Sequence, residues 1–212
     1  MPIMKLNFQG DPNVGLYGFA TERYGVCGVK NKHLSALGVK FHTIPLYGTH
    51  LSGLFAAGNS RGIVASKHLG KNEIAHMKSI AKVLMLDTSY TAIGNLILLN
   101  DNGIIISPLL RRHKKEIEEF FSLHCEVSTI AGIAVTGSVA VATNSGCLVH
   151  PKIKTNEKKV IEDVLNVQTT IGTVSFGSPF VKSGLIVNKN GTIVSDKSSG
   201  FELGNINEAF GF

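Results

Sequence analysis

An aliphatic run, a polar turn and a second aliphatic run follow one another in residues 94–108. The runs at 96–99 and 104–106 consist of leucine and isoleucine, which suit half-buried or fully buried strands. Between them lies the turn Asn100-Asp101-Asn102-Gly103, in which asparagine and glycine tolerate the positive φ angles of a tight turn. The pattern therefore predicts a β-hairpin.

This hairpin pattern recurs along the whole chain. Aligned on the glycine that opens the second strand, the five copies lie at residues 16–29, 53–66, 94–108, 137–151 and 182–195. The aligned glycines are Gly25, Gly62, Gly103, Gly146 and Gly191. Asn59, Asn100 and Asn188 stand at the same place in three copies, shortly before that glycine. A period of about 40 residues is typical of a repeat architecture.

The segments between the hairpins predict a helix and a further strand in each unit. Residues 71–83, 111–121 and 155–165 carry apolar side chains at helical spacing, and Thr155 is the expected N-cap of the last helix. Strand-like segments follow at residues 39–44, 83–88, 125–130 and 167–172. Each unit has too little apolar surface to be stable alone, so the units must pack on one another.

We therefore predict one α/β domain, residues 1–212, built of five β-turn-β-helix-β repeats. No linker separates the repeats, because five such units use the whole length of the chain. We expect the repeats to close into a ring rather than to form an open solenoid, because closure removes exposed sheet edges.

Composition restricts the class of protein. Of the 212 residues, 43% are hydrophobic and 17% are charged, which favours a folded chain over a disordered one. The net charge of +6 suits an anionic partner such as nucleic acid, although it also serves solubility. Cys27, Cys125 and Cys147 form no Cys-x-x-Cys pair, which favours a reduced, intracellular protein. We expect a soluble cytoplasmic protein, because residues 1–13 resemble no signal peptide and no apolar run is long enough to span a membrane.

Candidate catalytic motifs are weak in this chain. Ser60 lies in a Gly-x-Ser-x-Gly match, but that motif needs a strand before the serine and a helix after it, and Ser60 falls in a predicted hairpin turn. Cys125 and Cys147 fall in predicted strands, where free cysteine is commonly a small core residue. The chain also has no phosphate-binding loop, no dinucleotide fingerprint and no metal-binding histidine pair, so we expect no cofactor and no metal.

The basic run Arg111-Arg112-His113-Lys114-Lys115 has two interpretations. It could contact the phosphates of a nucleic acid. It could equally be the solvated face of a helix, with the pairs Arg112–Glu116 and Lys115–Glu119 at i,i+4 spacing.

Several short motifs, in order from end to end, carry a family resemblance. They are Phe8-x-Gly10-x-Pro12-x-x-Gly15, Gly58-Asn59-x-x-Gly62, Thr91-Ala92-Ile93-Gly94-Asn95-Leu96, Asn100-Asp101, Ser107-Pro108, Thr136-Gly137-Ser138, Asn144-x-Gly146-Cys147-Leu148-Val149-His150-Pro151, Gly172-Thr173-Val174 and Asp196-x-x-x-Gly200-x-Glu202-Leu203. In combination they resemble the translation initiation factor 6 family. The chain ends at Phe212 without the tail of eukaryotic members, which predicts an archaeal-type protein.

This resemblance implies both a fold and a function. The implied fold is the pentein, a five-bladed pseudo-symmetric α/β propeller, in agreement with the five repeats. The implied partner is the large ribosomal subunit, bound as a monomer against ribosomal protein L14 and near the sarcin-ricin loop. Bound there, the family member blocks the small subunit and takes part in large-subunit maturation, with no reaction catalysed.

A second class of protein shares the implied fold. Penteins include guanidine-modifying hydrolases and amidinotransferases, whose cysteine nucleophile lies in the last blade. This chain has no cysteine after Cys147, and short or apolar residues replace the central acids of those enzymes. The enzyme remains the alternative hypothesis, and a non-enzyme is favoured.

The predicted binding site lies where the hairpins begin. In a closed ring these beginnings converge on one face near the axis, and glycine there permits a close backbone approach. The candidate ribosome-binding residues are Leu16, Gly53, Leu54, Gly94, Asn95, Gly137, Ser138 and Ser183. Lys182 departs from the pattern, because a glycine is expected at its place. Asn95 could offer its amide to a partner or cap its own turn.

Overall fold

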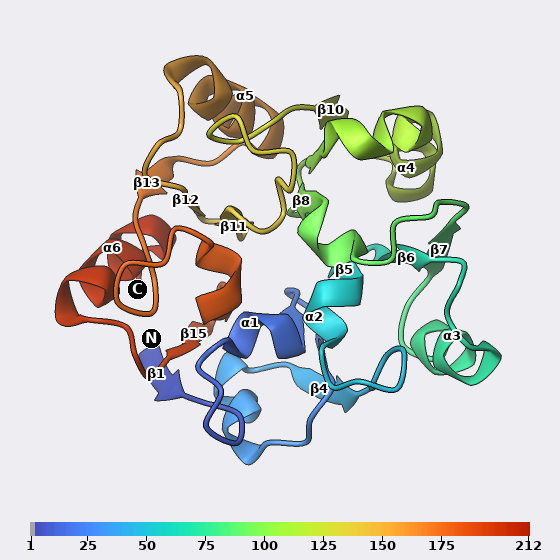
Figure 1. Cartoon of the computed structure of the whole chain (residues 1–212), viewed down its shortest axis with the longest axis horizontal. Coiled ribbons are helices and arrows are strands. Elements are labelled where there is room, and N and C mark those ends of the chain that lie inside the picture. The colour runs from blue at the N-terminus through green and yellow to red at the C-terminus, as the bar shows by residue number, and fades with distance from the viewer. Residues whose placement is uncertain (1–2) are drawn as a thin grey trace.

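Five three-stranded sheets surround a central axis in the computed structural model, which describes residues 3–212 (Figure 1). Each sheet has an inner strand, a middle strand antiparallel to it and an outer strand parallel to the middle one. The inner strands are β2 (Gly18–Ala20), β5 (Ala56–Asn59), β8 (Ile97–Leu99), β11 (Ala140–Ala142) and β14 (Leu185–Asn188). The middle strands are β3 (Tyr24–Cys27), β6 (Gly62–Ser66), β9 (Ile104–Ile106), β12 (Cys147–Val149) and β15 (Gly191–Ser195). The predicted pentein architecture is therefore confirmed.

The two ends of the chain meet in the fifth sheet. Four outer strands follow their own middle strands: β4 (Lys40–Thr43), β7 (Val83–Leu86), β10 (Cys125–Val127) and β13 (Thr169–Ile171). The fifth outer strand is instead β1 (Ile3–Leu6), which pairs in parallel with β15, so the chain termini lie close together (Figure 1). This pairing closes the ring, because the last sheet takes its edge strand from the start of the chain.

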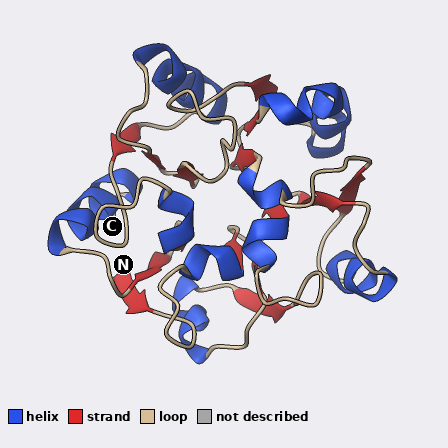
Figure 2. Ribbon diagram, viewed as in Figure 1, coloured by secondary structure: helices blue, strands red, loops and turns tan. Residues whose placement is uncertain are grey.

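Helices connect the middle and outer strands around the outside of the ring (Figure 2). They are η1 (Lys32–Leu37), α3 (Lys71–Lys78), η3 (Pro108–His113) continued by α4 (Lys114–Phe121), and α5 (Thr155–Leu165), with α6 (Gly200–Phe210) after β15. The hydrophobic core is divided among neighbouring sheets: one cluster joins Ala57 and Val64 of the second sheet to Ile97 and Ile104 of the third. The repeats thus pack on one another, as their small individual cores require.

Two local predictions about the helices were wrong. The basic segment does not begin a single helix at residue 111, because the Ser107 hydroxyl caps a 3-10 turn that starts at Pro108. Thr155 does not cap α5 either: it is the first helical residue. The backbone N–H of the preceding Lys154 donates instead to the Glu157 carboxylate at 3.0 Å.

The hairpin turn at Asn100–Gly103 also forms differently from the prediction. None of its four residues has a positive φ angle. The Asn100 side-chain oxygen accepts the backbone N–H groups of Asn102 (2.9 Å) and Gly103 (3.1 Å), and so closes the turn. The Asn100 side chain therefore closes the turn, and the turn does not need a residue in the left-handed backbone conformation.

Candidate functional site

Five short turns lead into the inner strands and surround the axis at one end of the ring. They are α1 (Val14–Tyr17), α2 (Ser52–Phe55), η2 (Ile93–Asn95), residues 136–138 and η4 (Val181–Gly184). We call these segments the axial turns and this end of the ring the axial face. Figure 2 shows the four helical ones grouped around the centre.

The axial turns pack backbone against backbone. A Cβ atom on Gly53 would lie 2.3 Å from the carbonyl oxygen of Gly15, and one on Gly94 would lie 2.1 Å from that of Gly53. A Cβ atom on Gly137 would lie 2.5 Å from the Gly94 oxygen. Such distances exclude any side chain, so glycine is required at these three positions. The series closes at Gly15, whose Cβ would lie 1.8 Å from the Lys182 oxygen.

Four of the predicted site residues line a single depression on the axial face. The depression has an empty volume of about 560 Å³ and is lined by Leu16, Asn95, Val135, Ser138, Phe180, Lys182 and Ser183. Leu54 is half-buried in α2 and lies outside this lining. Gly53, Gly94 and Gly137 are buried, and the backbone they admit belongs to the neighbouring turn. Their effect on a bound partner is therefore indirect, and the ribosome-binding role of all eight residues stays a prediction.

The sequence interpretation did not include Val135, Phe180 and Lys182 in the site. Val135 and Phe180 stand two residues before Gly137 and Lys182, so extending the repeat alignment by two positions would have found them. In the sequence, Lys182 stands out only because a glycine is expected at its place. No sequence pattern could have shown that its side chain reaches the Gly94 carbonyl on another axial turn.

Asn95 ends η2 with its side chain half-buried at the depression. Its backbone N–H donates to Ala92, and its carbonyl accepts the N–H of Gly137 at 2.9 Å. Among the described residues, the side-chain amide makes no hydrogen bond to the protein, so it does not cap its own turn. Two donors and one acceptor thus remain available at the surface.

The hairpin turns lie at the opposite end of the ring, where buried asparagines join neighbouring sheets. Asn59 donates to the Asn100 carbonyl at 2.8 Å, and Asn188 donates to the Thr21 carbonyl at 3.1 Å. Asn100 itself donates to the carbonyls of Thr143 and Leu165 at 3.0 and 2.8 Å. The asparagines that repeat in the sequence are therefore links between blades rather than parts of the candidate site.

The side chains that could act as nucleophiles, Ser60 and the three cysteines, are hydrogen-bonded or buried within the protein. Ser60 lies between β5 and β6, and its hydroxyl donates to the Asp101 carboxylate at 2.8 Å. The three cysteines are buried, and burial raises the thiol pKa of Cys27 to about 11 and that of Cys125 to about 12. The pKa of Cys147 is raised further for the same reason. Thiols in this state are poor nucleophiles at neutral pH, because the thiolate is the reactive form.

Two acidic side chains near the axial face are turned inward. Glu157 and Glu202 are 5% and 2% exposed. The Glu157 carboxylate accepts the backbone N–H groups of Ala131 and Gly132, and Glu202 accepts those of Phe176 and Gly177. Burial acts to raise the pKa of both groups, but these hydrogen bonds outweigh it and hold each pKa below the usual value for glutamate. Both carboxylates therefore have their hydrogen-bonding partners within the protein and do not face solvent.

Basic side chains of the axial face are turned outward. An exposed cation follows shortly after the middle strand of every sheet: Lys30, Lys67, Arg111 with Arg112, Lys152 and Lys197. They lie beside the axial turns, because each middle strand runs antiparallel to its inner strand and ends where that strand begins. We call these six residues the axial cations.

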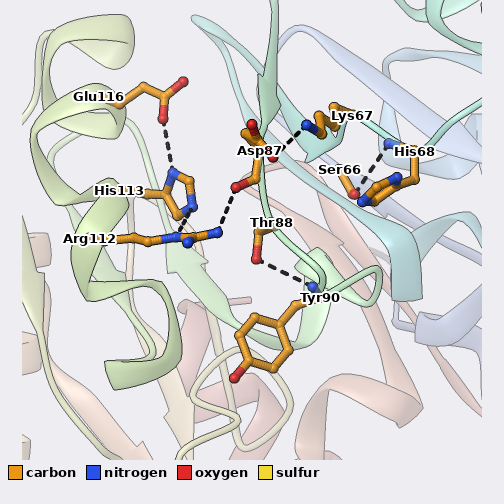
Figure 3. Close-up of polar contacts among 9 residues, drawn as sticks. All are labelled: Ser66, Lys67, His68, Asp87, Thr88, Tyr90, Arg112, His113 and Glu116. Atoms are coloured by element: carbon orange, nitrogen blue, oxygen red, sulfur yellow. Dashed lines mark hydrogen bonds and ion pairs between the residues drawn. The ribbon is translucent and has the colours of Figure 1, made fainter.

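Figure 3 shows two of the axial cations, Lys67 and Arg112, with their polar contacts. Lys67 pairs with Asp87 at 2.6 Å, and Arg112 donates to the Asp87 carbonyl at 2.7 Å. The hydrogen bond from Lys67 lowers the Asp87 pKa. The predicted pair Arg112–Glu116 is wrong, because Glu116 contacts His113 instead at 3.0 Å. Within the described part of the chain, the predicted pair of Lys115 with Glu119 does not form either.

Residues 3–212 contain neither a cluster of metal-ligating side chains nor a helix suited to a membrane. No group of three or more histidine, cysteine, aspartate or glutamate side chains gathers there in an arrangement that could hold a metal ion. Within the same residues, no helix has the length and apolar character needed to cross a membrane.

Comparison with known proteins agrees with the resemblance over the whole chain. The model of the eIF-6 family matches residues 3–209. Translation initiation factor 6 of Thermococcus onnurineus is 35% identical, with 100% of this chain and 99% of that protein covered. The protein of the same name from Pyrococcus horikoshii is 32% identical over 100% of both chains. The one from Methanocaldococcus jannaschii is 31% identical over 99% of this chain and 98% of that protein.

Proposed function

Because the chain belongs to the eIF-6 family of translation initiation factors, we propose that it binds the large ribosomal subunit through its axial face and prevents the small subunit from joining. The observation that carries this proposal is the depression in which Asn95 presents an unused amide between apolar and short polar side chains. An unpaired, half-buried polar group beside apolar side chains is typical of a protein interface.

The centre of the axial face suits a protein partner, for which we propose ribosomal protein L14. Leu16, Val135 and Phe180 supply apolar contact area, and Phe180 is 45% exposed in the absence of a partner. Asn95, Ser138 and Ser183 supply hydrogen-bonding groups between them. Apolar area with a few specific polar groups is the usual composition of an interface centre.

The rim of the axial face suits RNA, for which we propose the neighbouring sarcin-ricin loop. The axial cations are exposed, whereas Glu157 and Glu202 are buried and already hydrogen-bonded. Positive charge on this side attracts phosphates and releases their counterions on binding. This arrangement favours the phosphate interpretation for Arg111 and Arg112. Lys114 instead lies on α4 and pairs with Glu126 at 3.2 Å.

The proposed mechanism is steric occupancy without a chemical reaction. A monomer seated on the joining surface excludes the small subunit for as long as it remains bound, and the same occupancy serves large-subunit maturation in the cytoplasm. The alternative of a guanidine-modifying enzyme is disfavoured, because Cys147, the last cysteine of the chain, is buried in β12 with a raised thiol pKa.

A subunit-joining assay tests this function. We expect the protein to sediment with purified large subunits and to lower the yield of joined ribosomes when small subunits are added. Binding should weaken as salt increases, with a slope that reports the number of phosphates contacted. Protein that stays in the supernatant at low salt, or that binds without affecting joining, would disprove the proposal.

Replacement of Asn95 by alanine should weaken binding of the large subunit by about 1–3 kcal/mol, because a polar group of the partner loses its hydrogen-bonding counterpart at the interface. Thermal stability should stay close to that of the unmodified protein, since the amide has no partner within the described chain. Affinity and a thermal melt are measured together.

Asn207→Ala is the matched control for this substitution. Asn207 is exposed on α6, away from the depression, so its replacement should change neither property. Equal affinities for Asn95→Ala and Asn207→Ala would move the binding site elsewhere.

A further inference from the structure

Lys182 occupies the fifth place in the ring of axial glycines. The backbone N–H of Gly137 donates to the Asn95 carbonyl at 2.9 Å, and the N–H of Lys182 donates in the same way to the Ser138 carbonyl at 3.2 Å. In both bonds the donor lies on one axial turn and the acceptor on the axial turn of the preceding sheet. The acceptor is the residue directly after that turn's axial glycine. Lys182 is therefore structurally equivalent to Gly137, and it places a long cationic side chain where the other four turns have none.

The Lys182 side chain lies between two spaces on the axis. Its ammonium group donates a hydrogen bond to the Gly94 carbonyl, which belongs to the axial turn of the third sheet. On the surface side the residue lines the depression described above. On the inner side it lines a cavity bounded by the five inner strands. Lys182 thus borders both the depression and the interior of the ring.

The surroundings of this ammonium group lack a negative charge. Among the described residues that line the depression or the inner cavity, Lys182 is the only titratable one. No carboxylate of residues 3–212 lies within ion-pair distance of it, and burial lowers its pKa to about 7. The Asn95 amide and the Ser138 hydroxyl border the same depression and add hydrogen-bond donors. A half-buried ammonium group beside two free donors has the chemistry to bind an anionic group of a partner.

We infer that the depression recognises a carboxylate side chain of the protein partner, with Lys182 as its cation and Asn95 and Ser138 as additional donors. This inference rests on the proposed function and names the chemistry of the partner at that site. A carboxylate fits better than an RNA phosphate for two reasons. First, the lining of the depression combines a single cation with the apolar side chains of Leu16, Val135 and Phe180. Second, the axial cations, which suit a phosphate backbone, lie outside the depression.

The inference predicts a particular pH dependence of binding to the large subunit. In the free protein Lys182 is protonated below about pH 7 and neutral above it, so the cation is fully available only on the acid side. Bound carboxylate stabilises the protonated form, and affinity therefore decreases as pH rises above 7. We expect the affinity for the large subunit to decrease about tenfold between pH 6 and pH 9. This decrease is counted after subtraction of any change that a Lys182→Met variant shows over the same range.

Two substitutions separate charge recognition from structure. Lys182→Met keeps the length of the side chain and removes its charge, so affinity at pH 6 should fall about tenfold and the Lys182-dependent change with pH should disappear. Lys182→Arg keeps a charge at every pH, so it should retain binding at pH 6 and lose the decrease above pH 7. A thermal melt of each variant shows whether the fold is intact.

The outcomes distinguish this inference from the proposed function. If the unmodified protein does not bind the large subunit at all, the proposed function fails. If it binds and Lys182→Met binds equally well with the same pH profile, only the carboxylate site is overturned. Protein-free large-subunit rRNA is the second probe: Lys182→Met should bind it as well as the unmodified protein does. A tenfold loss on rRNA alone would show a phosphate ligand and would overturn the carboxylate assignment.

Discussion

Gly94→Ala should lower the free energy of unfolding by about 3 kcal/mol, near the upper end of the usual cost of overpacking. The new Cβ atom would lie 2.1 Å from the Gly53 carbonyl oxygen and 2.8 Å from that of Ala56. Both contacts are with backbone, which cannot move aside without displacing the whole second axial turn. Chemical denaturation of the variant and the unmodified protein gives the difference.

Gly204→Ala is the matched control, because it adds the same methyl group at a glycine with open surroundings. Gly204 lies inside α6, and a Cβ atom there would meet no other atom within 4 Å. Alanine is the better helix former, so this variant should gain about 0.5–1 kcal/mol. A difference in stability of less than about 1 kcal/mol between the two variants would show that the axial turns tolerate a Cβ atom at this position.

Asn100→Ala should cost about 3–4 kcal/mol of stability, because its loss leaves several buried polar groups without partners. Asn100 is 4% exposed and donates to the carbonyls of Thr143 and Leu165 in the next repeat. Its side-chain oxygen also closes its own hairpin turn. The substitution therefore weakens both the turn and the contact between the third and fourth sheets.

Asn102→Ala in the same turn is the comparison for this effect. Asn102 is exposed and donates one hydrogen bond, to the Leu165 carbonyl at 3.1 Å. Its replacement should cost no more than about 1 kcal/mol. Urea unfolding measures the free energy of unfolding of both variants. Equal decreases in that free energy would show that Asn100 acts as an ordinary turn residue.

The repeat was predictable because its signals are local. A hairpin needs two strand-forming runs and a turn. The turn Asn100–Gly103 and the leucines and isoleucines on either side of it all lie within 15 residues. Comparison of five copies then located the inner and middle strands of every sheet. The ends of the helices were harder to predict, because Ser107 and Glu157 act through hydrogen bonds that a periodicity of apolar residues does not describe.

Part of the candidate site followed from the same alignment. Leu16, Asn95, Ser138 and Ser183 stand at nearly the same place in their repeats, and a closed ring brings equivalent places together on one face. Val135 and Phe180 lie two residues before the segments that align, so the repeat pattern over those segments does not include them. The grouping of the axial cations was also present in the sequence, as one or more basic residues shortly after each middle strand, but the direction of the strands was needed to place them on the axial face.

The sequence by itself determined the five α/β repeats, the hairpins and the family, because these depend on residue types at short and regular separations. Only the tertiary structure decided how the ring closes and what lies at its axis. The pairing of β1 with β15 joins residues from opposite ends of the chain, and the Lys182 side chain reaches Gly94 across 88 positions of sequence. Such contacts form because closure of the ring buries surface that each repeat alone leaves exposed, and that free energy belongs to the assembled repeats rather than to any local segment.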